Sequence, residues 1–91
     1  MRIALIAKDK PGALDIRKAN RDAHVAYLRS SGEVVEMAGP FLDDDGNMCG
    51  SLIILNVQDM AEAEKWAAND PYKAADLFAS VELSAWNKVL G

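Results

Sequence analysis

Leu52-Ile53-Ile54-Leu55-Asn56-Val57 is the most continuous β-type run in the sequence, and it decides the fold. Its apolar residues occupy successive positions instead of alternate ones, which is typical of a strand that is buried on both faces. The run Arg2-Ile3-Ala4-Leu5-Ile6-Ala7 near the start of the chain has the same character. We therefore predict one sheet in which these two strands lie in the middle.

Two further strands and three helices are predicted around this centre. Glu33–Ala38 carries charged residues that are typical of an edge strand, and Gly39-Pro40 is expected to end it. Asp59-Met60-Ala61-Glu62 has the form of a capping box that opens a helix. In chain order the predicted segments are strand 2–7, loop 8–13, helix 15–31, strand 33–38, hairpin turn 43–47, strand 52–57, a helix from residue 59, a short helix 72–77 and strand 78–86.

The helices show the periodicity of surface helices that each bury one face. In the first helix the apolar residues that recur at intervals of three and four are Ile16, Ala19, Ala23, Ala26 and Tyr27. Gly32 follows as a C-terminal glycine. In the second helix the apolar face consists of Met60, Ala63, Trp66 and Ala67.

The order of elements, β-α-β-β-α-β, predicts an α+β fold with the ferredoxin-like arrangement. Its sheet has four antiparallel strands, and the first and third strands lie in the middle. Both helices lie on one face of such a sheet, so the other apolar face needs a different cover. The simplest cover is a second copy of the chain, and we therefore expect a homodimer.

Composition excludes several classes of protein. The chain has 91 residues, enough for a single domain, with 51% hydrophobic and 26% charged residues. Its net charge is −4 and it has no run of Lys or Arg, which argues against binding to nucleic acid or to an anionic membrane. No segment has a transmembrane length, and the apolar start lacks signal-peptide flanks, so a cytoplasmic location is expected.

No metal site or organic cofactor is expected. The sequence has one cysteine, Cys49, and one histidine, His24, too few for a zinc or iron cluster. The acidic run Asp43-Asp44-Asp45-Gly46-Asn47 lacks the alternating ligands and terminal Glu of an EF-hand, so we interpret it as a solvated turn. There is no phosphate-binding loop, dinucleotide fingerprint or serine triad.

Two segments contain candidate catalytic residues. Arg17, Arg21 and His24 are spaced i, i+4 and i+7, so they share a face of the first helix beside its apolar stripe. Asp70 precedes Pro71, which is the pattern of an N-cap residue followed by proline at the first helical position. Histidine exchanges a proton readily near neutral pH, and arginines beside it favour an anionic ligand.

Each of these residues also has a plain structural interpretation. A histidine at the border of a buried stripe can be a hydrogen-bonded core residue, and Asp70 can serve only as a helix cap. The arginines can pair with carboxylates in water. Gly39-Pro40 and Gly50-Ser51 flank the hairpin, where they can let a ligand approach the backbone or can simply shape the turn.

Six different short motifs are spread over nearly the whole chain. In order they are Arg17-x-x-x-Arg21-x-x-His24, Ala38-Gly39-Pro40, Asp45-Gly46, Gly50-Ser51, Asp70-Pro71-Tyr72 and Val81-x-x-x-x-Trp86. In this order and spacing the sequence resembles the YCII-related, or YciI-like, family. The fold of that family is shared with muconolactone isomerase and other dimeric α+β barrel proteins. The resemblance implies a homodimer of ferredoxin-like subunits, each with a pocket.

The resemblance also implies a histidine–aspartate pair, here His24 and Asp70, in that pocket. A family member with this pair eliminates chloride from a chlorinated hydroxyquinol without metal or organic cofactor. Our first hypothesis is therefore a cofactor-free lyase or isomerase acting on a small anionic or unsaturated molecule. The residues expected to bind the substrate are Arg17, Arg21, Gly39, Pro40, Ser51 and Tyr72. The alternatives are a dimeric module that binds a small metabolite without turnover, and a structural dimer without a site.

Overall fold

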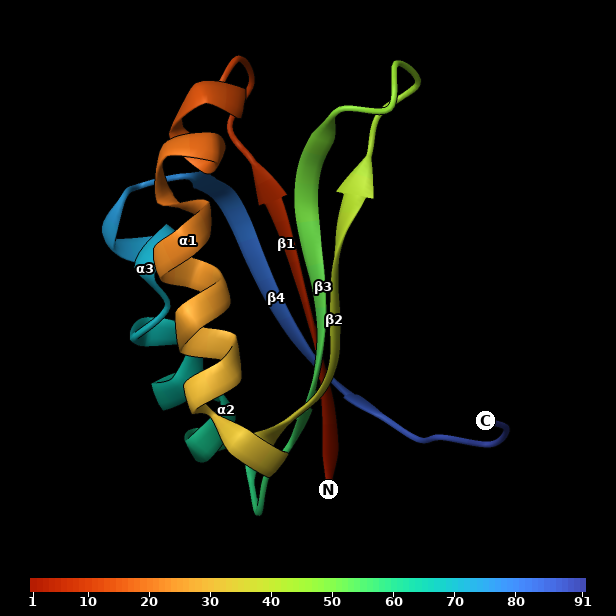
Figure 1. Ribbon diagram of the computed structural model, residues 1–91. Helices are drawn as coiled ribbons and strands as arrows, with labels where there is room; N and C mark the ends of the chain where they lie inside the picture. The colour runs from red at the N-terminus through yellow and green to blue at the C-terminus, as the bar shows by residue number, and fades with distance from the viewer.

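The protein, in a computed structural model that describes residues 1–91, is a four-stranded antiparallel sheet with helices on one face (Figure 1). The strand order is β2-β3-β1-β4, so the first and third strands are central, as predicted. The elements are β1 (Arg2–Asp9), α1 (Leu14–Ser30), a 3-10 turn (Gly32–Val34), β2 (Val35–Leu42), β3 (Met48–Asn56), α2 (Met60–Ala68), α3 (Pro71–Ala74) and β4 (Phe78–Trp86). This is the ferredoxin-like α+β arrangement expected from the sequence.

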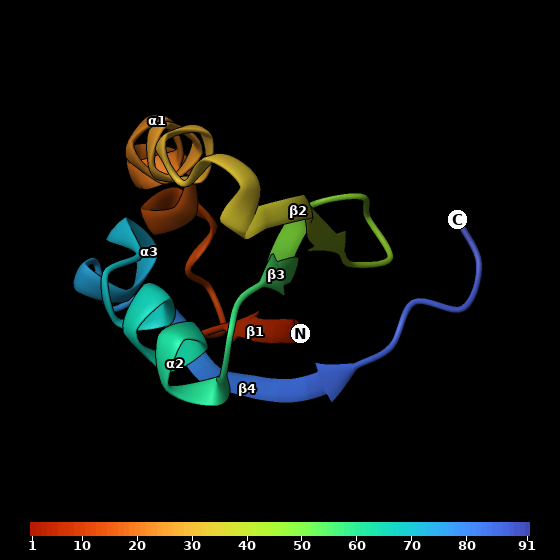
Figure 2. The same cartoon turned by 90° about the horizontal axis from the view of Figure 1, so that it is seen from below.

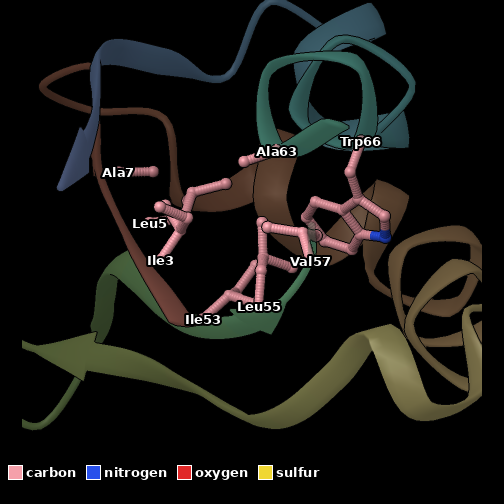
Figure 3. Close-up of a cluster of buried hydrophobic side chains, with 8 residues drawn as sticks. All are labelled: Ile3, Leu5, Ala7, Ile53, Leu55, Val57, Ala63 and Trp66. Atoms are coloured by element: carbon pink, nitrogen blue, oxygen red, sulfur yellow. The ribbon is translucent and has the colours of Figure 1, made fainter. Parts of the chain in front are cut away.

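The core lies between the central strands and α2. Figure 3 shows the side chains of β1 and β3 directed toward this helix. The eight buried residues of the core are Ile3, Leu5, Ala7, Ile53, Leu55, Val57, Ala63 and Trp66. The indole Nε1–H of Trp66 donates to Ser31 Oγ at 2.8 Å, and the Tyr27 hydroxyl donates to the Trp66 carbonyl at 2.7 Å. These bonds join the end of α1 to α2.

The predicted buried face of α1 is wrong. Of the predicted stripe only Tyr27 is partly buried, whereas Ile16, Ala19, Ala23 and Ala26 are exposed. The fully buried residues of the helix are Arg17 and His24. The face of α1 that carries Arg17 and His24 packs toward the interior because both side chains have hydrogen-bond partners there. These bonds offset the cost of burying the two polar groups. Alanines bury little apolar area, so they lose little by remaining in water.

The predicted end of β2 at Gly39-Pro40 is also wrong, because the strand continues to Leu42. β2 is an edge strand, and edge strands tolerate proline because one side of the strand has no neighbour to receive a backbone N–H group. Pro40 lies opposite Ser51 of β3. The extension keeps Gly39 and Pro40 paired with β3.

Two boundaries near the predicted loops also differ. Lys8 and Asp9 still pair with β4 and so belong to β1 and not to the loop 8–13. The short helix ends at Ala74, before the predicted Leu77, because Asp76 adopts a left-handed backbone with φ 58°. The predicted caps are present, since Asp59 and Asp70 each accept a backbone N–H at the start of their helices.

Gly50 gives a test of how closely β1 and β3 approach. A Cβ atom placed on Gly50 would lie 2.5 Å from the Ala7 carbonyl oxygen and 3.2 Å from a ring carbon of Phe41. We expect Gly50→Ala to lower the free energy of unfolding by about 2–3 kcal/mol, because backbone must move to admit the methyl group. Denaturant unfolding measures this change. The control is Gly39→Ala, whose Cβ meets nothing within 4 Å and should leave stability unchanged. Equal stability of the two variants would contradict the prediction.

The other face of the sheet carries no helix (Figure 2). In the ribbon the chain beyond β4 runs away from the sheet on this open side (Figures 1 and 2). None of the helices has the length and apolar character needed to cross a lipid bilayer.

Candidate active site

A cavity of about 150 Å³ lies between α1, the strands β2 and β3, and the start of α3. Its twelve lining residues are Arg17, Arg21, His24, Val25, Leu28, Ala38, Gly39, Pro40, Met48, Ser51, Ile53 and Tyr72. Seven of them are the sequence-predicted site residues other than Asp70. Asp70 does not line the cavity but contacts His24 from behind.

His24 and Asp70 form the contact that the sequence predicted. His24 Nδ1 lies 2.9 Å from Asp70 Oδ1, and both side chains are buried. The same oxygen accepts the backbone N–H of Tyr72 at 2.9 Å, because Asp70 is the N-cap of α3. An ionised carboxylate can only accept, so Nδ1 carries the hydrogen and Nε2 remains available to a ligand. Nε2 has no hydrogen-bond partner within the chain.

Tyr72 holds the imidazole ring of His24 in place. The two rings stack with centroids 3.9 Å apart and planes 15° apart, and Phe78 meets Tyr72 edge-on at 5.9 Å. Burial raises the pKa of Tyr72 above its ordinary value of 10.0, although the charge of Arg17 opposes this shift. Tyr72 is therefore a neutral phenol at physiological pH. The histidine is fixed both through its Nδ1 atom and through its face.

Arg17 is held by a second aspartate that the sequence analysis did not single out. Its Nε and Nη2 atoms donate to Asp9 at 2.6 and 2.8 Å, and Nη2 also donates to Ser51 Oγ at 3.0 Å. The guanidinium carbon lies 4.7 Å from the ring centroid of Tyr72. Burial by itself would lower the pKa of Arg17, but the hydrogen bond and charge of Asp9 outweigh it and raise the pKa. Arg17 thus stays charged, with its charge compensated inside the protein.

Arg21 differs from Arg17 although both line the cavity. Arg21 is exposed and forms no ion pair within the chain. Its charge remains available to a ligand at the cavity mouth, whereas that of Arg17 is neutralised by Asp9. The structure therefore separates two arginines that helical spacing alone had made equivalent.

The sequence analysis missed Asp9 and the apolar wall of the cavity. Asp9 was assigned to a loop, so its place opposite the start of α1 could not be inferred. The apolar lining residues it missed are Val25, Leu28, Ala38, Met48 and Ile53. Once the structure shows that Arg17 is buried, its need for a carboxylate partner explains the position of Asp9.

No three His, Cys, Asp or Glu side chains lie close enough together to hold a metal ion.

Comparison with known proteins gives concordant matches over the whole chain. A model of the YCII-related domain matches residues 1–87. An uncharacterised protein of Haemophilus influenzae is 32% identical over 97 aligned positions, which span 98% of this chain and 99% of that protein. Protein YciI of Escherichia coli O6:H1 is 32% identical over 98 positions, with the same coverage of 98% and 99%.

A similar solved structure is that of an enzyme. It is 5-chloro-2-hydroxyhydroquinone dehydrochlorinase from Burkholderia phenoliruptrix, in complex with 2,5-dihydroxybenzoquinone. The TM-score is 0.88 at 34% sequence identity, and the match covers 96% of this chain and 94% of the enzyme.

Proposed function

The chain belongs to the YCII-related domain family, and from this membership we propose that it is a small-molecule enzyme that transfers protons through His24. The reaction is an isomerisation or elimination that needs no metal or organic cofactor. The observation that carries this proposal is the His24–Asp70 hydrogen bond, at 2.9 Å, beside a ligand-sized cavity. The similarity to the dehydrochlorinase supports a single-ring hydroxylated substrate.

The chemistry follows from the position of the histidine. Nε2 of neutral His24 takes the proton of a ring hydroxyl, and the electron pair of that O–H bond forms a carbonyl. The proton then returns to a ring carbon, which completes an isomerisation. Where that carbon bears chloride, chloride leaves with its bonding pair and a second hydroxyl loses its proton, so that HCl is eliminated. Asp70 keeps the hydrogen on Nδ1 and stabilises the imidazolium between these steps.

Replacing His24 by glutamine tests the proposal. The assay is chloride release from 5-chloro-2-hydroxyhydroquinone, with binding of 2,5-dihydroxybenzoquinone measured separately. We expect turnover to fall by on the order of 10²–10⁴-fold while binding changes only a few-fold, because glutamine retains a polar side chain but does not exchange a proton. Lys18→Gln, on an exposed position of α1, should behave as wild type.

The outcomes separate the three functional hypotheses. Turnover that survives in His24→Gln contradicts proton transfer by this residue. Binding without turnover in the wild-type protein favours the metabolite-binding module. A protein that neither binds nor turns over aromatic hydroxy compounds favours a structural dimer.

We also propose a homodimer formed through the open face of the sheet. The strand registers place four large apolar side chains on this face, and each is substantially exposed: Met37 (50%), Trp86 (41%), Phe41 (38%) and Leu52 (36%). A second copy would remove them from water. An interface of standard size buries about 1,200–2,000 Å² in total.

Sedimentation velocity tests the dimer. We expect one species of twice the chain mass at micromolar concentration, and a monomer for Met37→Glu, which places a charge at the edge of the apolar surface. Glu64→Gln, on the exposed side of α2, is the control. A wild-type monomer at this concentration contradicts the proposal.

A further inference from the structure

Ser51 is a buried polar residue whose hydrogen-bonding direction is determined by its neighbour. It lies on β3, is 2% exposed and lines the cavity. Its Oγ atom is 3.0 Å from Nη2 of Arg17. A guanidinium has five donors and no acceptor, so the serine oxygen must accept in this bond. The hydroxyl hydrogen of Ser51 has no acceptor within the chain, so it is available to donate a hydrogen bond to a ligand in the cavity.

Arg17, the group that sets this direction, is itself held by several contacts. Arg17 is 2% exposed, and both oxygens of Asp9 receive its N–H groups. The guanidinium carbon of Arg17 lies over the ring of Tyr72. A bidentate pair with a carboxylate fixes the plane of an arginine far better than a single bond does. Asp9 and Arg17 therefore hold Ser51 in one orientation before any ligand arrives.

The cavity brings this donor together with a proton acceptor. His24 lines the same space with Nε2 unpartnered, and Arg21 adds a positive charge at the mouth. The rest of the wall is largely apolar, and a volume of about 150 Å³ suits one six-membered ring. A ring oxygen that loses its proton to His24 becomes an anion beside a largely apolar wall. Such an anion requires a donor that is already in position.

We propose that the Ser51 hydroxyl donates a hydrogen bond to the oxygen anion of a single-ring phenolate or enolate. Asp9 and Arg17 are positioning residues, because they act through Ser51 and need not touch the ligand. The inference rests on the proposed function in that it names the substrate class of the same site. It does not require turnover, since an anion donor can be measured by binding alone.

The test uses 4-nitrophenol, a single-ring phenol whose anion absorbs visible light. Titrating the probe with and without protein gives the affinities of its neutral and anionic forms. We expect the wild-type protein to prefer the anion, and Ser51→Ala to reduce this preference by about 10- to 100-fold, the usual value of a hydrogen bond to a charged group. The affinity for neutral phenol should change little. Ser51→Thr retains the hydroxyl and should restore part of the preference.

Two further variants identify the source of the preference. Ser80→Ala removes an exposed serine of β4 and should leave the preference unchanged. Arg21→Gln should also weaken anion binding, but the contribution of Arg21 is screened at high salt, whereas the Ser51 bond inside the cavity is not. The Ser51→Ala effect should therefore persist in about 0.5 M salt, where screening lengths fall to a few ångströms.

Asp9→Asn tests the positioning role. It should lower the preference for the anion by less than Ser51→Ala does, and should have no further effect in the Ser51→Ala background. If Ser51→Ala keeps the wild-type preference, or if the wild-type protein does not bind the 4-nitrophenolate anion, the proposal is overturned. Loss of turnover in His24→Gln would stand in either case, so failure here is distinct from failure of the proposed proton transfer.

Discussion

Replacing Asp70 by asparagine is expected to reduce turnover by on the order of 10²-fold while the protein stays folded. The introduced side chain would keep Oδ1 as the acceptor of His24 Nδ1–H and of the Tyr72 N–H. Oδ2 of Asp70 has no partner, so the amide nitrogen can take its place without breaking a bond. What is lost is the negative charge that stabilises the imidazolium. The buried amide should lower the free energy of unfolding by about 1–2 kcal/mol.

Asp70→Ala separates the catalytic charge from the helix cap. It leaves the Tyr72 N–H and the His24 ring without an acceptor, so stability should fall by about 2–4 kcal/mol as well. Asp59→Ala is the matched control, because Asp59 caps α2 at an exposed position away from the cavity. It should lower stability by about 1 kcal/mol and leave turnover unchanged. Full activity of Asp70→Asn would show that the charge has no catalytic role and that Asp70 is a plain cap.

Arg17→Met is expected to lower the free energy of unfolding by about 3–5 kcal/mol, the largest stability change that we predict. Both members of the Asp9–Arg17 pair are buried, with side-chain exposures of 5% and 3%. Removing the arginine leaves the carboxylate buried without a counter-charge, and the methionine side chain cannot hydrogen-bond to it. For a domain of this size such a loss is a large fraction of the total stability.

The double variant Asp9→Leu/Arg17→Met removes the whole ion pair, whereas Arg17→Met alone leaves the Asp9 carboxylate buried without a counter-charge. Its stability should exceed that of Arg17→Met, since no unpaired ion remains, and the coupling between the two sites should be about 1–3 kcal/mol. Arg2→Met breaks the partly exposed pair with Glu36 and should lower stability by about 1 kcal/mol or less. Chemical denaturation measures all three. Equal stability of the single and double variants would mean that solvent reaches Asp9.

Part of the site could be predicted because its residues have strong local signals. Asp followed by Pro favours an N-cap from local preferences alone, and the Asp70 cap is present as predicted. The choice of His24 as its partner depended on the family resemblance and on there being one histidine. The inward side of α1 could not be predicted in the same way. Its alanines and its polar residues gave two competing faces, and which one was buried depended on partners from β1, β3 and α3.

The sequence by itself determined the elements, their order and the two central strands. Continuous apolar runs such as Leu52–Leu55 favour central strands, and the two strands that contain such runs, β1 and β3, are central in the sheet. Only the tertiary structure decided the burial of Arg17 and His24, the pairing of Arg17 with Asp9 and the availability of Arg21. The physical reason is that burying a polar side chain is favourable or unfavourable according to its hydrogen-bond partners. Those partners come from segments up to 46 positions away in the chain, a separation at which periodicity along one helix carries no information.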